Sequence, residues 1–409
     1  MKNNIFKGKI MILIAIVSIS FSLWADTINN TSLAAIYTQF QDAGAFLQTY
    51  IITGPYLVSI PFVLIVGKLA EKINKKTLMV ISLLIYTVGG VSAAFANSMA
   101  AFALSRSLAG IATCIIGALA HSIIFENFPK ANDSAKVMGI YQAFSTGYGA
   151  VLGIAAGIVC TINWRYAQYL NGLAILSALA VLLFLPKVQS AKADAHSEEG
   201  HDPEEESEYV IEGKTDVKRV IFTLFEATFS IVFCFVFNYF VALYVVERGI
   251  GTEALAGLLA SLMTLGGVVA NVLLGRIFEV FQRYTGIVFA LVCALVMTIL
   301  GFDAPVWLVI TAALLNGVVV GVICSYYPIA VNQYVPAKKS TFYQSVYACV
   351  MYVGFYLVSF VPNLYMSIFG GGYQRVMRIN GIILAAAGVL LLLVIKSVIA
   401  KKPVKTAEK

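Results

Sequence analysis

The sequence predicts an all-α membrane protein with twelve transmembrane helices, arranged as two six-helix repeats with both termini in the cytoplasm. Hydrophobic residues make up 60% of the 409 residues and charged residues only 12%, about half the share in a soluble protein. Apolar runs long enough to cross a bilayer, about 20 helical residues each, recur along nearly the whole chain. Short polar breaks separate these runs, which argues against a large soluble core.

Twelve apolar runs define the predicted spans. In the first half they cover 10–37, 46–66, 77–96, 100–124, 136–160 and 167–186. In the second half they cover 220–246, 253–274, 285–302, 304–328, 340–367 and 376–397. The first run is too long for a signal peptide and has no clear cleavage site, so we interpret it as a span. The predicted domains are a six-helix bundle over 1–186, an acidic cytoplasmic linker over 187–219, a second bundle over 220–397 and a basic cytoplasmic tail over 398–409.

The placement of basic residues predicts the orientation of the chain. With the N-terminus in the cytoplasm, 23 of the 28 lysines and arginines fall in cytoplasmic segments and only four in outer loops. The remaining one, Arg106, lies inside the fourth predicted span. We therefore expect an integral protein of the cytoplasmic (inner) membrane of a prokaryote.

Three landmarks recur in the two halves of the chain at offsets of 207 to 209 residues. The pairs are Gly67 with Gly275, Pro129 with Pro336, and Asn171 with Asn380. Three coincidences in register indicate a duplicated unit. Duplicated halves are typical of secondary transporters, whose substrate site lies at the interface between the repeats.

The segment Gly67–Lys76, with the sequence GKLAEKINKK, joins the second and third predicted spans. It resembles the inner-loop motif G-x-L-a-D-r-x-G-r-k/r of the major facilitator superfamily. Asn74 replaces the second glycine of that motif, and asparagine is the next best residue where φ must be positive. An ordinary basic loop is the alternative interpretation.

The resemblance implies a gating loop, because a carboxylate among basic groups can form contacts that break and form again during transport. Its residues are Gly67, Glu71, Lys72, Lys75 and Lys76, with Gly275 and Glu279 in a partial second copy. The second copy has lost most of its basic residues. We therefore expect the first copy to carry most of the gating interaction.

The segment Ala103–Gly110 resembles the fourth-span motif l-x-x-x-R-x-x-q-G of the same superfamily. An arginine inside a span is costly, so we expect Arg106 to face the interior of the bundle. The alternative is a side chain that extends to the outer interface. Gly110 is expected to serve helix packing.

The segment Asp26–Asn30 resembles the first-span motif D-x-T-x-x-N of drug:proton antiporters. Asp26 is the one carboxylate of the first predicted span, and Asn30 lies one turn further on the same face. The resemblance implies a proton site at Asp26, and our hypothesis is that Arg106 lies at similar depth and modulates its charge. The alternative is an interfacial carboxylate that faces outside water.

Glycines four residues apart in the fifth predicted span, Gly149, Gly153 and Gly157, predict a groove for a neighbouring helix. The run resembles the antiporter motif g-x-x-x-G-P-x-x-G-G, but Ile154 stands at the proline position. Since this motif separates exporters from importers in the superfamily, its incomplete form leaves import open. Helix packing alone also explains the glycines.

Aromatic and amide side chains gather in the spans of the second half and predict a cavity for an amphipathic or lightly polar substrate. The cavity residues are expected to be Asn238, Asn316, Tyr327, Tyr343, Gln344 and Tyr347, together with Asp26, Asn30 and Arg106. Packing in the core is the alternative for any single tyrosine.

Two acidic features allow more than one interpretation. Glu226 in the seventh predicted span fits a second proton site or a residue at the inner interface. The linker 187–219 holds eight acidic residues between 198 and 212 and fits a metal or regulatory site or a solvated tether. We interpret it as a tether, because such a composition cannot bury a core.

Missing motifs argue against several other function classes. The sequence has no Walker loop, nucleophile elbow, H-E-x-x-H motif or paired-cysteine motif, and its six cysteines all lie in apolar runs. We therefore expect no enzyme activity, no cofactor, no metal site and no nucleic-acid partner.

The predicted function is secondary active transport by alternating access, with proton-coupled export of a small amphipathic compound or metabolite as the main prediction. A proton-coupled nutrient importer (symporter) on the same fold is the first alternative. A non-transporting membrane sensor is the alternative from another class. The expected partners are a small-molecule substrate, protons and the lipid bilayer, and the protein is expected to be a monomer.

Overall fold

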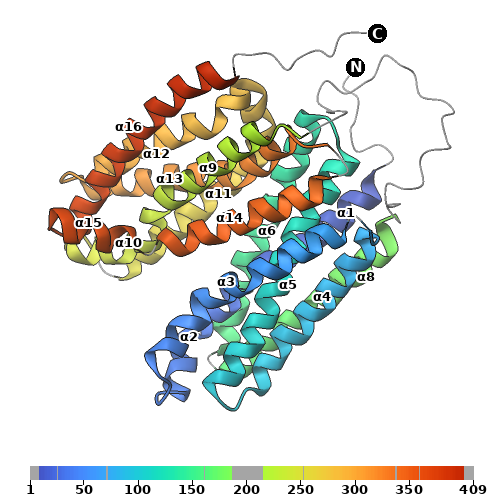
Figure 1. Ribbon diagram of the computed structural model, residues 1–409. Coiled ribbons are helices and arrows are strands. Elements are labelled where there is room, and N and C mark those ends of the chain that lie inside the picture. Colours follow the sequence, from blue (N-terminus) through green and yellow to red (C-terminus); the bar gives the residue numbers. More distant parts are fainter. Residues whose placement is uncertain are drawn as a thin grey trace, which may run out of the picture. The chain divides into compact units, whose positions relative to one another are not determined.

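The computed structural model of the chain describes residues 9–24, 26–70, 72–160, 162–186, 215–251, 253–336, 339–358 and 360–399. Within these ranges the regular structure is entirely helical (Figure 1). The acidic linker lies almost wholly outside them, as do most of the C-terminal tail and Glu71 of the expected gating loop.

The first half of the chain forms helices that follow the predicted spans closely. They are α1 (Ile10–Ile19), η1 (Ser20–Trp24), α2 (Asp26–Gln39), α3 (Ala45–Leu69), α4 (Lys75–Ser92), η2 (Ala93–Phe95), α5 (Met99–Asn127), α6 (Ala131–Cys160), α7 (Trp164–Gln168), η3 (Tyr169–Leu173) and α8 (Ala174–Phe184). The first predicted span is thus divided into α1, η1 and α2. Serines cause the tightening, because Ser18, Ser20 and Ser22 each donate to the carbonyl three residues earlier.

The second half continues the same pattern. Its helices are α9 (Val217–Cys234), α10 (Val236–Glu247), α11 (Glu253–Phe281), η5 (Gln282–Tyr284), α12 (Thr285–Leu300), α13 (Val306–Asn332), α14 (Ser340–Val358), α15 (Val361–Phe369) and α16 (Tyr373–Ile399). The eleventh predicted span is divided into α14 and α15, where Pro362 occupies the first turn of α15.

All twelve predicted spans coincide with a helix or a run of consecutive helices. Nine helical stretches of the described chain are long and apolar enough to cross a bilayer, and one of them, Leu258–Leu300, covers two predicted spans. Shorter apolar helices, Ile10–Ser22 and Leu57–Leu69, lie in the first and second predicted spans. The prediction of an all-α membrane fold is confirmed; the orientation of the termini stays a prediction.

The chain forms two compact units. The first contains Met1–Thr215 together with Val331–Val353, and the second contains Asp216–Ala330 together with Gly354–Lys409. The end of α13 and most of α14 therefore belong to the first unit, although they come from the second half of the sequence. Within the first unit α5 packs along α3 and α4, and within the second unit α12 packs along α16.

The repeated asparagines, Asn171 in η3 and Asn380 in α16, are both buried. Asn171 is 2% exposed and its amide donates to the carbonyl of Gln168 at 3.0 Å. Asn380 is fully buried and its amide donates to the carbonyl of Phe233 in α9 at 2.8 Å. Each side chain satisfies a backbone carbonyl inside its unit, as a buried amide must.

Candidate transport site

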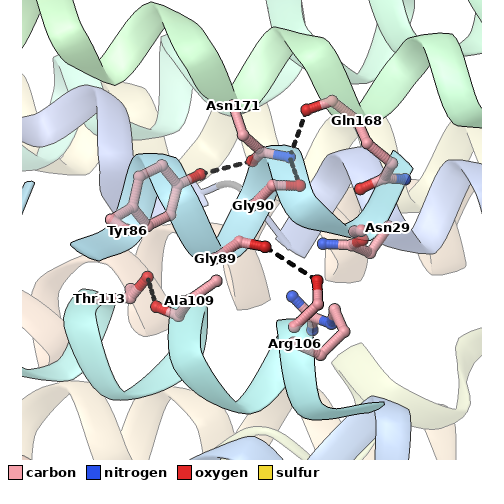
Figure 2. A pocket seen from close by; sticks show the side chains of 11 residues that line it. Asn29, Tyr86, Gly89, Gly90, Arg106, Ala109, Thr113, Gln168 and Asn171 are labelled. Atoms are coloured by element: carbon pink, nitrogen blue, oxygen red, sulfur yellow. Dashed lines mark hydrogen bonds between the residues drawn. The ribbon is translucent and has the colours of Figure 1, made fainter. Parts of the chain in front are cut away.

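A small polar cavity lies inside the first unit, among α2, α4, α5, α7 and η3 (Figure 2). Its lining residues are Asn29, Tyr86, Gly89, Gly90, Ala93, Ser105, Arg106, Ala109, Thr113, Gln168 and Asn171. The space left between them holds about one water molecule. In this conformation the cavity is a polar centre of the unit and has no room for a drug-sized compound.

Arg106 lies in the interior of the first unit. The residue is only 5% exposed, and its Nε donates to the carbonyl of Ile51 in α3 at 3.4 Å. Figure 2 shows Arg106 and Asn29 directed into the same space, from α5 and α2 respectively. A guanidinium is costly inside a membrane span, so a polar lining of this kind is needed to hold it.

A hydrogen-bonded network holds the opposite wall of the cavity. Tyr86 Oη donates to Asn171 Oδ1 at 2.7 Å, and Ser105 Oγ donates to the carbonyl of Gly89 at 2.8 Å. These bonds connect α4 with η3 and α5. The sequence did not lead us to place Asn29, Tyr86, Ser105, Gln168 or Asn171 at a site. Of these residues, Asn171 could have been singled out, because it recurs in the second half of the chain as Asn380.

Asp26 and Asn30 both belong to α2, as its first and fifth residues. Asn29, which lines the cavity, lies between them and is 7% exposed. The side chains of Asp26 and Asn30 lie outside the described part of the molecule, so the expected coupling of Asp26 to Arg106 stays a prediction.

Lys75 of the first copy of the inner-loop motif forms a partly buried ion pair with a residue of α5. Lys75, at the start of α4, is 8% exposed and contacts Glu126 Oε1 at the end of α5. Its Nζ also donates to Ser122 Oγ at 2.8 Å, and Ser122 in turn lies 2.6 Å from Thr341 Oγ1 of α14. Glu126 and Ser122 were not expected from the sequence, because nothing in their local pattern distinguishes them from other polar residues near a helix end.

The other residues of this loop have simpler roles. Asn74 caps α4, with Oδ1 accepting from the Lys76 backbone nitrogen at 2.9 Å and φ at −58°. The expectation of a positive φ at Asn74 was therefore wrong: the position needs an N-cap, which asparagine provides. Lys76 Nζ donates to the carbonyls of Leu182 and Leu185 at the end of α8, where a cation is favourable. Lys72 is exposed.

Gly67 lies where α3 and α14 approach within the first unit. A Cβ added to Gly67 would lie 2.5 Å from Ser345 Oγ and 3.4 Å from Phe342 Cα. Only glycine allows this approach without movement of α14. Gly110 plays a similar part between α5 and α3, since a Cβ there would lie 2.7 Å from Pro55 Cβ.

The second copy of the motif is not a loop. Gly275 and Glu279 lie inside α11, which continues to Phe281, so the expected loop position was wrong. The reason is local: no helix-breaking residue follows Gly275, and Leu274 and Phe278, four residues apart, are both buried and hold the helix against its neighbours. Gly275 is buried and Glu279 is exposed.

The fifth-span glycines lie in α6, where Gly149 is buried and Gly153 and Gly157 are half-buried. Leu152 and Ala156 of α6 form a buried cluster with Ile28 of α2. The larger side chains on this helix therefore provide the apolar contact with α2.

The residues expected to line the substrate cavity divide between the units. In the first unit, Gln344 and Tyr347 are fully buried beside His121: Gln344 hydrogen-bonds His121, and the ring centroids of Tyr347 and His121 are 6.4 Å apart. Tyr343 is half-buried and packs its ring edge-to-face on Phe342. None of these three residues lines the cavity around Arg106.

In the second unit, the expected cavity residues make internal bonds. Asn316 is fully buried and donates to the carbonyl of Cys234 at 3.3 Å. Asn238 is half-buried, with Nδ2 3.7 Å from Met263 Sδ. Tyr327 is fully buried and bonds Ser230. Asn316 and Tyr327 thus have no contact with solvent in this conformation.

Comparison with known proteins identifies the family. A family model described as Major Facilitator Superfamily matches residues 12–253 and 225–409. The chain belongs to the major facilitator superfamily. Transport by this chain itself stays a proposal.

Relatives and solved structures agree with this assignment. The multidrug transporter protein MdtP of Bacillus subtilis is 29% identical over 167 residues, which is 40% of this chain and 30% of MdtP. The chain therefore matches less than a third of the length of that relative.

The Escherichia coli fucose:proton symporter FucP has a TM-score of 0.70 at 14% identity, covering 94% of this chain and 98% of FucP. The human organic anion transporter MFSD10 has a TM-score of 0.69 at 14% identity, covering 92% of this chain and 98% of MFSD10. At such identities these structures show a shared major facilitator fold.

Proposed function

We propose that this major facilitator protein exports a small amphipathic compound in exchange for protons. The observation that carries the proposal is the buried Arg106 in a polar cavity that α2 also lines through Asn29. Asp26 lies one helical turn before Asn29 in α2. A carboxylate that gains and loses a proton beside a buried arginine couples proton binding to the electrostatic state of the cavity.

The direction of transport is inferred from relatives. MdtP is named a multidrug transporter, and a relative from Streptomyces alboniger, 26% identical over 140 residues, is named a puromycin resistance protein. The first name refers to transport of several drugs and the second to resistance to a toxic compound, and export would account for both. The similarity covers only part of those proteins, so export by this chain stays a proposal, with symport as the competing function.

The inner cluster around Lys75 is proposed to hold one conformation of the transport cycle. Lys75, Glu126, Ser122 and Thr341 form a continuous polar contact that ties α4 and α5 to α14 inside the first unit. Helix α14 continues beyond this unit, since the second unit takes over at Gly354. Alternating access requires such contacts to break and form again.

Transport into proteoliposomes under an imposed pH gradient tests the function. We would measure accumulation of ethidium and of puromycin in liposomes that are acidic inside and in liposomes that are acidic outside. An antiporter accumulates the compound when the inside is acidic, because protons leave as the compound enters. A symporter accumulates it when the outside is acidic, and a sensor accumulates it in neither case.

The variant Asp26→Asn tests the proton site. We expect the pH-driven accumulation of the compound to fall at least about tenfold in this variant, because a neutral asparagine side chain cannot bind and release a proton. The matched control is Asp42→Asn, which removes an exposed acid that follows α2. Unchanged proton-coupled transport in Asp26→Asn would refute the role of Asp26.

A further inference from the structure

A buried carboxyl group lies in the second unit, and the proposed function does not use it. Glu226 is located in the third turn of α9 and is 4% exposed. Ionised carboxylates inside a span are costly and normally have a basic partner. The surroundings of Glu226 therefore decide whether this group is held as a carboxylate or as a carboxylic acid.

One hydroxyl group bonds Glu226 directly, and a second hydroxyl group bonds the first. Tyr327 Oη donates to Glu226 Oε1 at 3.3 Å, and Ser230 Oγ lies 2.7 Å from Tyr327 Oη. A hydroxyl bonded to a charged carboxylate is drawn in to about 2.5–2.7 Å. The distance to Oε1 is longer than this, and the shorter hydrogen bond joins Ser230 and Tyr327.

A glycine in α12 makes room for this arrangement. A Cβ added to Gly286 would lie 2.7 Å from both Glu226 Oε1 and Tyr327 Oη. Any other residue at this position would displace one of the two polar groups. The carboxyl group of Glu226 from α9 and the phenol of Tyr327 from α13 thus pack closely against the backbone of α12 at Gly286.

The titratable groups that the structure describes next to Tyr327 and Cys234 are phenols and thiols, apart from Glu226 itself. They are Tyr326, Cys293 and Cys324. Basic residues near the ends of the same helices make other contacts: Arg219 pairs with Asp216 at 3.3 Å, and Arg283 Nη2 donates to Tyr284 Oη at 3.0 Å. Among the described residues, no ion pair joins Glu226 to a lysine, arginine or histidine.

We propose that Glu226, hydrogen-bonded by Tyr327, is a proton-binding site of the second unit. In the conformation described here the carboxyl group holds a proton. When the site meets water during the cycle, the carboxyl O–H bond breaks, the proton moves to water, and a carboxylate remains. This inference rests on the proposed transport function and adds a second transported proton to the one assigned to Asp26.

Infrared spectroscopy tests the protonation state without a substrate. The protein is reconstituted in proteoliposomes and its spectrum is recorded from about pH 5 to about pH 9, a range in which ordinary carboxyl groups are ionised. An Asp26→Asn background removes the other proposed proton site. We expect the carbonyl stretch of a protonated carboxyl group at neutral pH, and we expect Glu226→Gln to abolish it.

Two further variants make the assignment specific. Asp303→Asn is the matched control, because the Asp303 side chain is 92% exposed, and it should leave the band in place. Tyr327→Phe should keep the band but shift it to higher wavenumber, because the carbonyl oxygen loses its hydrogen bond. This second variant also gives the answer if Glu226→Gln does not fold.

The proposal is overturned if neutral pH shows no protonated carboxyl band, or if the band survives Glu226→Gln, or if Tyr327→Phe leaves its position unchanged. Ethidium accumulation by the protein with Asp26 intact, reconstituted in the same way, separates the two proposals. A band that depends on Glu226 without pH-driven transport contradicts the transport function alone. Transport with no such band contradicts the proton site alone.

Discussion

At the residue scale, the polar side chains of this protein are held by partners from distant parts of the sequence. Arg106 bonds the backbone of α3, and Lys75 pairs with Glu126 at the far end of α5. In both cases a charged group leaves water and depends on a few fixed contacts. Removing one partner of a buried charge costs more than the contact itself contributes, because the other partner remains unsatisfied.

Replacing Arg106 by alanine should lower pH-driven accumulation by at least about tenfold, equivalent to about 1.4 kcal/mol. The physical reason is loss of the cation that we propose acts on Asp26. Initial rates in proteoliposomes at equal protein density measure the effect. Thr146→Ala is the control, since Thr146 Oγ1 bonds only the carbonyl of Gln142 in its own helix. A rate for Arg106→Ala equal to that of the control would contradict the role of Arg106.

The Lys75–Glu126 pair should show strong coupling in a double-mutant cycle. Lys75→Met and Glu126→Gln should each lower the free energy of unfolding. The double variant should lose less of this free energy than the two single variants lose together, and the difference, the coupling energy, should be about 1–3 kcal/mol. Thermal unfolding in detergent, followed across the four proteins, measures this coupling. Additive effects would mean that the ion pair does not form.

At the scale of helices, close approach depends on positions without a side chain. The absence of a side chain at Gly67 lets Ser345 of α14 pack closely against α3. The corresponding glycine of the second copy, Gly275, lies two turns before the end of the continuous helix α11. The two motif copies have therefore diverged in structure as well as in charge. The first copy retains the turn, the N-cap and the buried lysine, which supports our expectation that it carries the gating contact.

Replacing Gly67 by alanine should destabilise the conformation described here by about 1–3 kcal/mol, because the new methyl group overlaps Ser345. Ser345→Gly should restore much of the loss in the double variant. Gly147→Ala in α6 is the matched control, since a Cβ there meets nothing within 4 Å. Melting temperatures in detergent compare the variants. If Gly67→Ala behaves like Gly147→Ala, the close approach of α3 and α14 is not present in the protein.

At the scale of the whole molecule, the division into units differs from the division of the sequence into halves. The segment Val331–Val353 comes from the second half but belongs to the first unit, where its hydroxyl and aromatic groups meet Ser122, His121 and Gly67. Part of the second half of the sequence thus packs with the first unit. The movement of α14 is therefore the structural change that we expect to accompany transport.

The predicted orientation has a direct test. In a cysteine-free background, Ser197→Cys in the linker should react with a membrane-impermeant maleimide only when the cytoplasmic face is accessible. Asn97→Cys, in an exposed turn between η2 and α5, should react only from the outside. The physical reason is the excess of lysine and arginine on one side. Labelling of both positions from the same side would refute the topology.

The sequence by itself determined the membrane class, the positions of all twelve spans, the repeat and the family, because span length, apolar composition and motif spacing are local properties of the chain. Only the tertiary structure showed that Lys75 meets Glu126, that Asn29 and Asn171 share a cavity with Arg106, and that Gly286 makes room for Glu226 and Tyr327. These contacts depend on which faces of distant helices meet and at what height along their axes. In apolar helices with weak amphipathic patterns, as in this chain, neighbouring residues do not specify that choice; packing of the whole unit does.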